Sequence, residues 1–286
     1  MVALESTIIS HGLPRPGNLA AARSFESLLA DAGVSPATIA VIDGVPKAGL
    51  DDSDLERIAL DESVVKVSSR DLGMAIAGKR TAGTTVAATS VLAARAGIRV
   101  FATGGLGGVH RGYAGTLDES ADLTVLSRTR ITVVSAGVKS ILDIPATLER
   151  LETLGVAVAG YRTSKFPAFY LSDSGQALDW RLDTPEEIAS VMAARDCLGE
   201  KSALLIGNPL SPDRQLDPAL HDRVLREALD AAAAAGIRGK AVTPFLLDHM
   251  QRGTGGASIR VNLDVARGNI ALAGRIATAW ASLTRP

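Results

Sequence analysis

Hydrophobic residues along this chain fall into two recurring patterns. Short, continuous runs rich in β-branched residues predict buried strands at 38–42, 64–68, 98–102, 131–135, 156–161 and 203–206. Longer Ala- and Leu-rich segments with helical spacing predict helices at 18–32, 52–60, 84–96, 140–154, 184–196 and 216–235, with further helical patterns at 244–252 and 262–283. Continuously hydrophobic strands separated by helices indicate a mainly parallel sheet covered on both faces, which is a three-layer α/β/α fold.

Composition narrows the class of protein. The 286 residues are 47% hydrophobic and 21% charged, which is typical of a globular chain with a large core. No linker-like stretch or repeat interrupts them, so we expect a single catalytic domain over residues 1–286. The 30 basic and 31 acidic residues nearly cancel and aromatic residues make up 3%, which disfavours a nucleic-acid partner.

The cellular compartment is suggested by the cysteine count and by the hydropathy of the chain. Cys197 is the only cysteine, so no internal disulfide forms and a reducing compartment is favoured. No apolar run approaches the roughly 20 residues that span a bilayer, and the N-terminus has no basic segment of the kind that begins a signal peptide. We therefore expect a cytoplasmic protein with no membrane partner.

The stretch FATGGLGGVHRG (101–112) places several glycines, His110 and Arg111 directly after an expected strand. A loop at the carboxyl end of a parallel strand is where an α/β protein holds an anionic ligand, and glycines permit close backbone approach. The dinucleotide fingerprint fails, because His110 stands where its third glycine belongs. The alternative is a purely structural glycine turn, which leaves the two polar side chains unexplained.

A lysine follows the next expected strand, in VVSAGVKSILD (133–143). The pattern places Lys139 at the start of a helix, where the partial positive charge of the helix terminus would favour a neutral amine. A neutral amine attacks a carbonyl or an anomeric carbon. The alternative is a solvated surface lysine.

Carboxylates mark two further stretches. LDESADL (117–123) holds Asp118, Glu119 and Asp122, which are oxygen ligands suited to Mg²⁺ or Mn²⁺ or else part of a charged, solvated turn. Glu5 lies in the apolar run ALESTIISHG, where desolvation would raise its pKa towards that of a general acid. The alternative is that Glu5 is an ordinary glutamate on an edge strand, which would give the same sequence pattern.

In TAGTTVAATS (81–90), a Gly/Thr turn leads into a helix. The backbone amides at the start of this helix would either hold phosphate or simply be capped by the turn.

These stretches together resemble one known family. ALESTIISHG, PATIAVIDG, KVSSRDL, GTTVAAT, VFATGGLGGVHRG, SADL, AGVKSILD, TPFLL and TGGASIRVN occur in this order from Ala3 to about Trp280. They closely resemble the pseudouridine-5′-phosphate glycosidases. The resemblance implies a metal-dependent α/β/α lyase, typically a homotrimer using Mn²⁺ (Mg²⁺ being an alternative). It implies reversible cleavage of the C–C glycosidic bond of pseudouridine 5′-phosphate with water to give uracil and ribose 5-phosphate, a step of pseudouridine catabolism.

The resemblance also implies roles for individual residues. Lys139 is the nucleophile that forms an imine (Schiff base) at the anomeric carbon, Glu5 is the proton donor, and Asp118 binds the metal. The substrate-binding positions that it implies are Lys66, Val86, Ser120, Ala121, Asp122, His110 and Asn262. For the substrate phosphate we expect the backbone amides around 84–86 and a positive charge from Lys66 or Arg111.

Several positions depart from the family pattern, among them RGNI (267–270), which replaces an Asn-Asn pair. Glu119 adds a carboxylate near the metal ligand, and Ser69 stands where an arginine is frequent, so affinity and metal preference are open. Two other functions compete with the glycosidase. One is a different imine-forming lyase or aldolase acting on a sugar phosphate, and the other is a non-catalytic protein that binds a nucleotide sugar.

Overall fold

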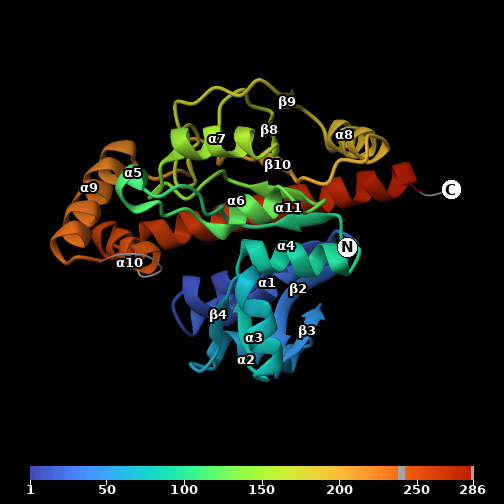
Figure 1. The fold of residues 1–286 in the computed structure, drawn as a ribbon, viewed down its shortest axis with the longest axis horizontal. Coiled ribbons are helices and arrows are strands. Elements are labelled where there is room, and N and C mark those ends of the chain that lie inside the picture. The colour runs from blue at the N-terminus through green and yellow to red at the C-terminus, as the bar shows by residue number, and fades with distance from the viewer. Residues whose placement is uncertain (238–241, 285–286) are drawn as a thin grey trace.

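The computed structural model describes residues 1–237 and 242–284, and a ten-stranded sheet lies at their centre (Figure 1). The strands are β1 Val2–Glu5, β2 Pro36–Ile42, β3 Val45–Ala48, β4 Val65–Val67, β5 Ala82–Thr84, β6 Val100–Ala102, β7 Thr132–Ser135, β8 Ala157–Tyr161, β9 Arg181–Leu182 and β10 Leu204–Gly207. Their order is β4-β5-β2-β1-β6-β7-β10-β8-β9, with β3 paired to β2. The pairs β2–β3 and β2–β5 are antiparallel and the other seven pairs are parallel, so the predicted mainly parallel sheet is confirmed.

All six expected strands are present, as β2, β4, β6, β7, β8 and β10. The strands β1, β3, β5 and β9 were not predicted, and none of them is longer than four residues. β5 has the sequence AGT, whose small residues lack the β-branched character that signals a strand, and β3 is largely exposed. These strands exist because neighbouring strands supply their hydrogen-bond partners.

The longer helices also follow the expected pattern, with corrected boundaries, whereas three helices of four to six residues were not predicted. The helices are α1 Gly17–Asp31, α2 Asp52–Leu60, α3 Leu72–Ala77, α4 Val86–Arg95, α5 Tyr113–Thr116, α6 Ala121–Leu126, α7 Ile144–Thr153, α8 Pro185–Cys197, α9 Pro218–Ala234, α10 Val242–Gly253 and α11 Ala257–Thr284, with short turns η1 Ile8–Gly12 and η2 Ser69–Asp71. Among residues 1–237 and 242–284, none of the helices has the length and apolar character needed to cross a bilayer.

The helix expected at 140–154 begins only at Ile144. The Asp143 carboxylate accepts a hydrogen bond from Ala146 N at 3.1 Å, and a proline stands in the first turn, so the capping signals lie four residues later than the hydrophobic pattern suggested. Lys139 therefore lies in the loop between β7 and α7. The prediction that a helix N-terminus acts on Lys139 is wrong.

Among the described residues, the two larger of three hydrophobic clusters cover the two faces of the sheet. Alternate residues of the central strands point to opposite sides, as Phe101 does relative to Val100 and Ala102. Residues of α1, α8 and α11 form one core with Val100 and Ala102, and residues of α4, α6 and α7 join Phe101 in the other. The helices thus make two outer layers, which confirms the three-layer fold, and the long helix α11 crosses the whole molecule (Figure 1).

Candidate active site

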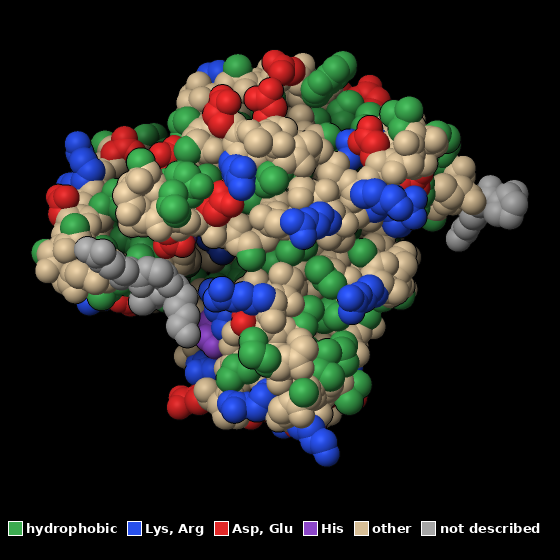
Figure 2. Space-filling view, in the orientation of Figure 1, with side chains coloured by type: hydrophobic (Ala, Val, Ile, Leu, Met, Phe, Trp, Pro, Cys, Tyr) green, Lys and Arg blue, Asp and Glu red, His purple; other side chains and the backbone are tan. Residues whose placement is uncertain are grey.

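Two adjoining cavities of about 670 and 310 Å³ contain every residue to which the sequence assigned a catalytic, substrate-binding or metal-binding role by resemblance. Glu5, Lys66 and Lys139 line both cavities, and Asn262 lines the larger one. The smaller cavity is also lined by Val86, His110, Asp118, Ser120, Ala121 and Asp122. Lys and Arg side chains gather around the waist of the face drawn in Figure 2, between the upper and lower parts of the molecule.

Glu5 ends β1 and is 9% exposed. Apolar side chains, among them Phe25 and Ile270, line a small space next to Glu5, and the Thr103 hydroxyl donates a hydrogen bond to its carboxylate. Burial raises the pKa of Glu5 above its usual 4.5, while Lys139, the Thr103 hydrogen bond and Lys66 oppose this change. The environment therefore favours a protonated carboxyl group that faces a cavity, as a general acid requires.

The loop that carries Lys139 is held on several sides. Gly137 has φ of +81°, and a Cβ there would collide with the carbonyl oxygen of Pro167, so only glycine fits. Lys139 N donates to Leu106 O at 3.1 Å, which ties the loop to the segment after β6. On the far side of the loop, the Ser140 hydroxyl hydrogen-bonds His221 Nε2 of α9 at 2.9 Å. A backbone fixed in this way limits the positions open to the amine.

Lys66 of β4 brings a second amine to the same cavity. Lys66 as a whole is exposed, but partial desolvation of its amine lowers its pKa, and the nearby charge of Lys139 lowers it further. The carboxylates of Glu5 and Asp122 partly counteract both effects. Two lysines and two carboxylates thus interact at close range, which is typical of a catalytic or anion-binding centre.

The loop at 101–112 needs its glycines for a different structural reason from the one expected. A Cβ on Gly105 would come within 2.6 Å of Phe169 Cδ2, and a Cβ on Gly107 within 2.7 Å of Asp122 Oδ2. These glycines allow protein side chains to pack against the backbone. Gly104 and Gly105 also line the large cavity, so the loop contributes to the site mainly as its floor.

The amides expected to hold phosphate are mostly occupied by the protein itself. Thr84 N donates to Ser6 Oγ at 2.9 Å and Thr85 N to Val67 O at 3.0 Å, whereas Val86 N makes no hydrogen bond within the part of the chain that the structure describes. The Asp122 carboxylate accepts from Ala87 N at 2.9 Å and from Gly107 N at 2.8 Å. Asp122 therefore caps α4 and fixes the loop after β6. The prediction for residues 84–86 is corrected, with Val86 N alone left for a ligand.

Of the two cations expected for the phosphate, Lys66 lines both cavities and Arg111 does not. Arg111 donates to Ser140 O at 3.4 Å and lines neither cavity. Arg70 of η2 lines both, with a side chain that is 82% exposed, so it stands at the mouth of the site beside Lys66.

The side chains that come nearest to forming a metal site are those of Asp118 and His110. Asp118 Oδ2 lies 4.0 Å from His110 Nδ1, and burial lowers the pKa of His110. Glu119 is turned to Arg150 in a bidentate ion pair of 3.0 and 3.1 Å. Among the residues that the structure describes, no three His, Cys, Asp or Glu side chains converge in a metal-binding group. A hard divalent ion at this place would take Asp118 as a protein ligand, and water would fill most of its other positions.

Sequence reasoning missed several residues of the larger cavity and its surroundings, Arg70 among them. Within the described residues, Thr7 Oγ1 and Asn262 Oδ1 are buried without a hydrogen-bond partner, and both residues line the cavity. Thr103 contacts Glu5, and Phe169 forms part of the wall. Thr7 had a signal in the sequence, because its hydroxyl follows Glu5 by two residues. Thr103 and Phe169 had none, because only the fold brings them there.

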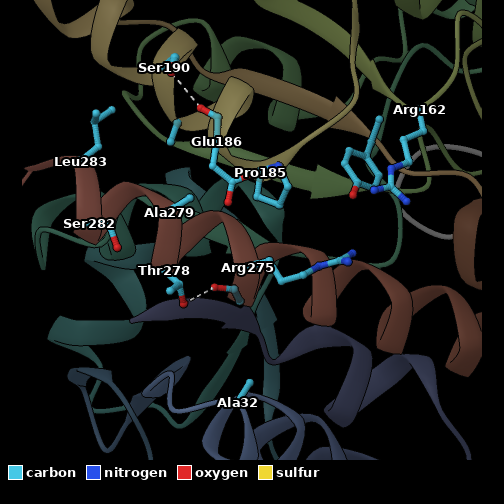
Figure 3. A pocket seen from close by; sticks show the side chains of 13 residues that line it. Ala32, Arg162, Pro185, Glu186, Ser190, Arg275, Thr278, Ala279, Ser282 and Leu283 are labelled. Carbon is cyan, nitrogen blue, oxygen red and sulfur yellow. Dashed lines mark hydrogen bonds between the residues drawn. The ribbon is translucent and has the colours of Figure 1, made fainter.

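A further cavity of about 650 Å³ lies between α8 and the C-terminal part of α11 (Figure 3). Arg162, Glu186 and Arg275 are among the residues that line it. None of the lining residues is one that the sequence singled out. The chemistry therefore concentrates in the two adjoining cavities.

Comparison with known proteins gives full-length matches. The model of the family described as Indigoidine synthase A like protein matches residues 1–279. The pseudouridine-5′-phosphate glycosidase of Frankia alni is 61% identical over 285 residues, covering 100% of this chain and 79% of the relative. The corresponding protein of Saccharopolyspora erythraea is 59% identical, with 98% and 93% covered.

Two solved structures are similar throughout. The prealnumycin C-glycosynthase AlnA, in complex with ribulose 5-phosphate, superposes with a TM-score of 0.91 at 37% identity, covering 99% of this chain and 92% of that one. An indigoidine synthase A-like protein of Thermotoga maritima also has a TM-score of 0.91, at 35% identity, with 99% and 93% covered. The likeness therefore extends to the whole fold.

Proposed function

Because this chain belongs to the family of Indigoidine synthase A like proteins, and its relatives at about 60% identity are pseudouridine-5′-phosphate glycosidases, we infer that it is an enzyme of that activity. It cleaves the C–C glycosidic bond of pseudouridine 5′-phosphate. One observation links this activity to particular residues: the buried Glu5 carboxyl group and Lys139 line the same cavity.

A C–C glycosidic bond has no leaving oxygen or nitrogen to protonate, so the bond needs an electron sink at the anomeric carbon. We propose that the Lys139 amine attacks this carbon while Glu5 protonates the ring oxygen, which opens the ribose ring. The proton that leaves the Lys139 nitrogen returns to Glu5. When the C–C bond breaks, its electron pair stays on uracil C5, which takes that proton, and the nitrogen lone pair forms the imine. Water then hydrolyses the imine to ribose 5-phosphate and free lysine.

The unpartnered polar atoms of the large cavity support a place for the base. Thr7 Oγ1 and Asn262 Oδ1 are buried and have no hydrogen-bond partner in residues 1–237 and 242–284, and an unsatisfied buried polar group costs about 1–3 kcal/mol. A uracil ring offers both N–H donors and carbonyl acceptors. We therefore assign the base to this part of the cavity, against Phe169.

The phosphate is assigned to the opposite wall. Lys66 and Arg70 supply positive charge there, and Val86 N supplies a donor at the start of α4. The helix terminus adds a favourable field for an anion. Ser120 and Ala121 line the same wall and complete the expected substrate contacts.

Asp118, with His110 beside it, would hold a divalent ion such as Mn²⁺ or Mg²⁺. When bound, such an ion polarises oxygen atoms and orients water near the reacting groups. We also propose a homotrimer, which the family resemblance supports, and a cytoplasmic location, which the nucleotide substrate supports. Light scattering coupled to gel filtration measures the first, and fractionation of cells measures the second.

The experiment that tests the function is release of uracil from pseudouridine 5′-phosphate, followed by chromatography, with Mn²⁺ present and after its removal. Uracil and ribose 5-phosphate should appear in equal amounts, and uracil with ribose 5-phosphate should run the reaction backwards. A protein that binds the nucleotide and releases no uracil would contradict the assignment. Release of ribose 5-phosphate from other sugar phosphates alone would favour a different lyase.

A further inference from the structure

Asn269 of α11 is 1% exposed and lines neither cavity of the site, yet its side chain holds the backbone beneath them. Its Nδ2 donates to Thr103 O at 2.8 Å and to Gly104 O at 3.3 Å. Its Oδ1 accepts from Asn208 Nδ2 at 2.9 Å. The amide thus uses both donors and its acceptor, and it joins α11 to the carboxyl ends of β6 and β10.

The backbone segment that Asn269 holds includes Thr103, whose side chain hydrogen-bonds Glu5. Thr103 donates its hydroxyl to the Glu5 carboxylate, and Thr103 N is fixed to Val134 O of β7 at 3.0 Å. Gly104 O also accepts from Ala136 N at 3.0 Å. Asn269 therefore completes a set of contacts that leaves Thr103 little freedom to move.

The sequence spacing on α11 links this contact to the substrate cavity. Asn262 and Asn269 are seven residues apart, about two helical turns, and so lie on one face of the helix. A Cβ added to Gly104 would lie 3.3 Å from Asn262 Oδ1, so this amide packs against the glycine. One face of α11 therefore presents one amide to the cavity and another to the backbone below its floor.

Proton transfer depends on this placement, because hydrogen bonds weaken steeply with distance and angle. A small movement of Thr103 would carry its hydroxyl away from the carboxyl group. We propose that Asn269 is a positioning residue for the acid of this reaction, fixing Thr103 so that its hydroxyl orients Glu5. This inference rests on the proposed role of Glu5.

Loosening Thr103 would also change the pH dependence of the reaction. The groups that face Glu5 are the Thr103 hydroxyl, Lys139, Lys66 and Asp122. The hydrogen bond and the two lysines lower the pKa of Glu5, whereas burial and Asp122 raise it. A looser Thr103 removes one lowering influence, so the pKa of Glu5 rises further. Activity that needs protonated Glu5 then persists to higher pH, although its maximum falls.

The test compares Asn269→Leu, which has similar volume and no hydrogen-bonding group, with Thr103→Val and with the double variant. We expect Asn269→Leu to lower kcat by about tenfold or more and to move the alkaline limb of the pH–rate profile upwards. The double variant should lose no more than about threefold beyond Thr103→Val alone, because both changes act through one hydroxyl. Asn208→Leu is the matched control: it removes the partner of Asn269 Oδ1, keeps both donors, and should stay within about threefold of the parent.

Several outcomes would overturn the proposal. These are multiplicative losses in the double variant, or an alkaline limb of Asn269→Leu that coincides with the parent. If Asn269→Leu does not fold, as judged by circular dichroism, Asn269→Ala is measured against the same expectations. Glu5→Gln separates the two levels of inference. If it is fully active, the proposed acid is wrong; if it is inactive while the Asn269 and Thr103 losses multiply, only the present proposal fails.

Discussion

Replacing Glu5 with Gln is the strongest test of the proposed chemistry. Gln has the same shape and still accepts the Thr103 hydrogen bond, but it cannot give up and recover a proton. A general acid contributes about 10²–10⁴-fold to a rate. At 1.36 kcal/mol for each factor of ten, this is about 2.7–5.4 kcal/mol of the barrier. We therefore expect Glu5→Gln to fold and to bind ribose 5-phosphate, with kcat lower by that factor.

The same substitution should change the pH dependence of stability. Burial raises the pKa of Glu5 in the folded protein, so below about pH 4.5 the group is neutral in both the folded and unfolded states. Between the pKa of the unfolded state and the higher pKa of the folded state, only the unfolded state has lost its proton. In that interval the folded protein loses stability as the pH rises, by about 1.4 kcal/mol for each pH unit. Gln has no such loss. Glu5→Gln should therefore gain stability over the parent as the pH rises.

The assays are uracil release by chromatography and urea denaturation followed by circular dichroism at about pH 5 and pH 8. Glu26→Gln is a matched control, because Glu26 of α1 is half-buried, accepts from Thr38 Oγ1 at 2.6 Å and has a pKa that burial raises, yet it lines neither cavity. It should change stability in the same direction and leave kcat within about twofold. Glu5→Gln activity within about threefold of the parent would refute the reasoning.

Further predictions concern the nucleophile, the metal and the base. Borohydride with ribose 5-phosphate should add one sugar phosphate to the peptide that carries Lys139, and Lys139→Ala should abolish the adduct; an adduct on another lysine would contradict the assignment. Removing the metal with EDTA should abolish activity reversibly without unfolding, and Asp118→Ala should lose both activity and metal dependence; full activity of metal-free protein would exclude this ligand. Glu119→Ala should cost under about 1 kcal/mol of stability and little activity, because it breaks only a partly exposed ion pair with Arg150; loss of metal binding would instead make Glu119 a ligand. Asn262→Leu should raise the KM for uracil in the synthetic direction by roughly 5- to 150-fold, the equivalent of one buried hydrogen bond, while imine trapping stays near the parent rate; an unchanged KM would remove the base from this wall.

Local sequence patterns determined the main features of the fold. Continuous β-branched runs identified β2, β4, β6, β7, β8 and β10 apart from their ends, and helical spacing identified the longer helices that cover them but not the short helix α6. The position of Glu5 in an apolar run, and of Lys139 after a strand, also marked them as unusual before any fold was known. These features depend on neighbours in the sequence, and the sequence displays those neighbours directly.

Only the tertiary structure decided which groups meet. Asp122 occupies the Ala87 amide in the first turn of α4, and Glu119 turns to Arg150, because partners 35 and 31 residues away complete their hydrogen bonds. Asn269 reaches a carbonyl 166 residues earlier in the chain, and no periodicity in the sequence records that contact. The start of α7 shows the same limit on a smaller scale, since a capping carboxylate outweighed the hydrophobic pattern. Strands and helices follow from local preference, whereas the site follows from long-range packing that brings the carboxyl ends of parallel strands to one edge of the sheet.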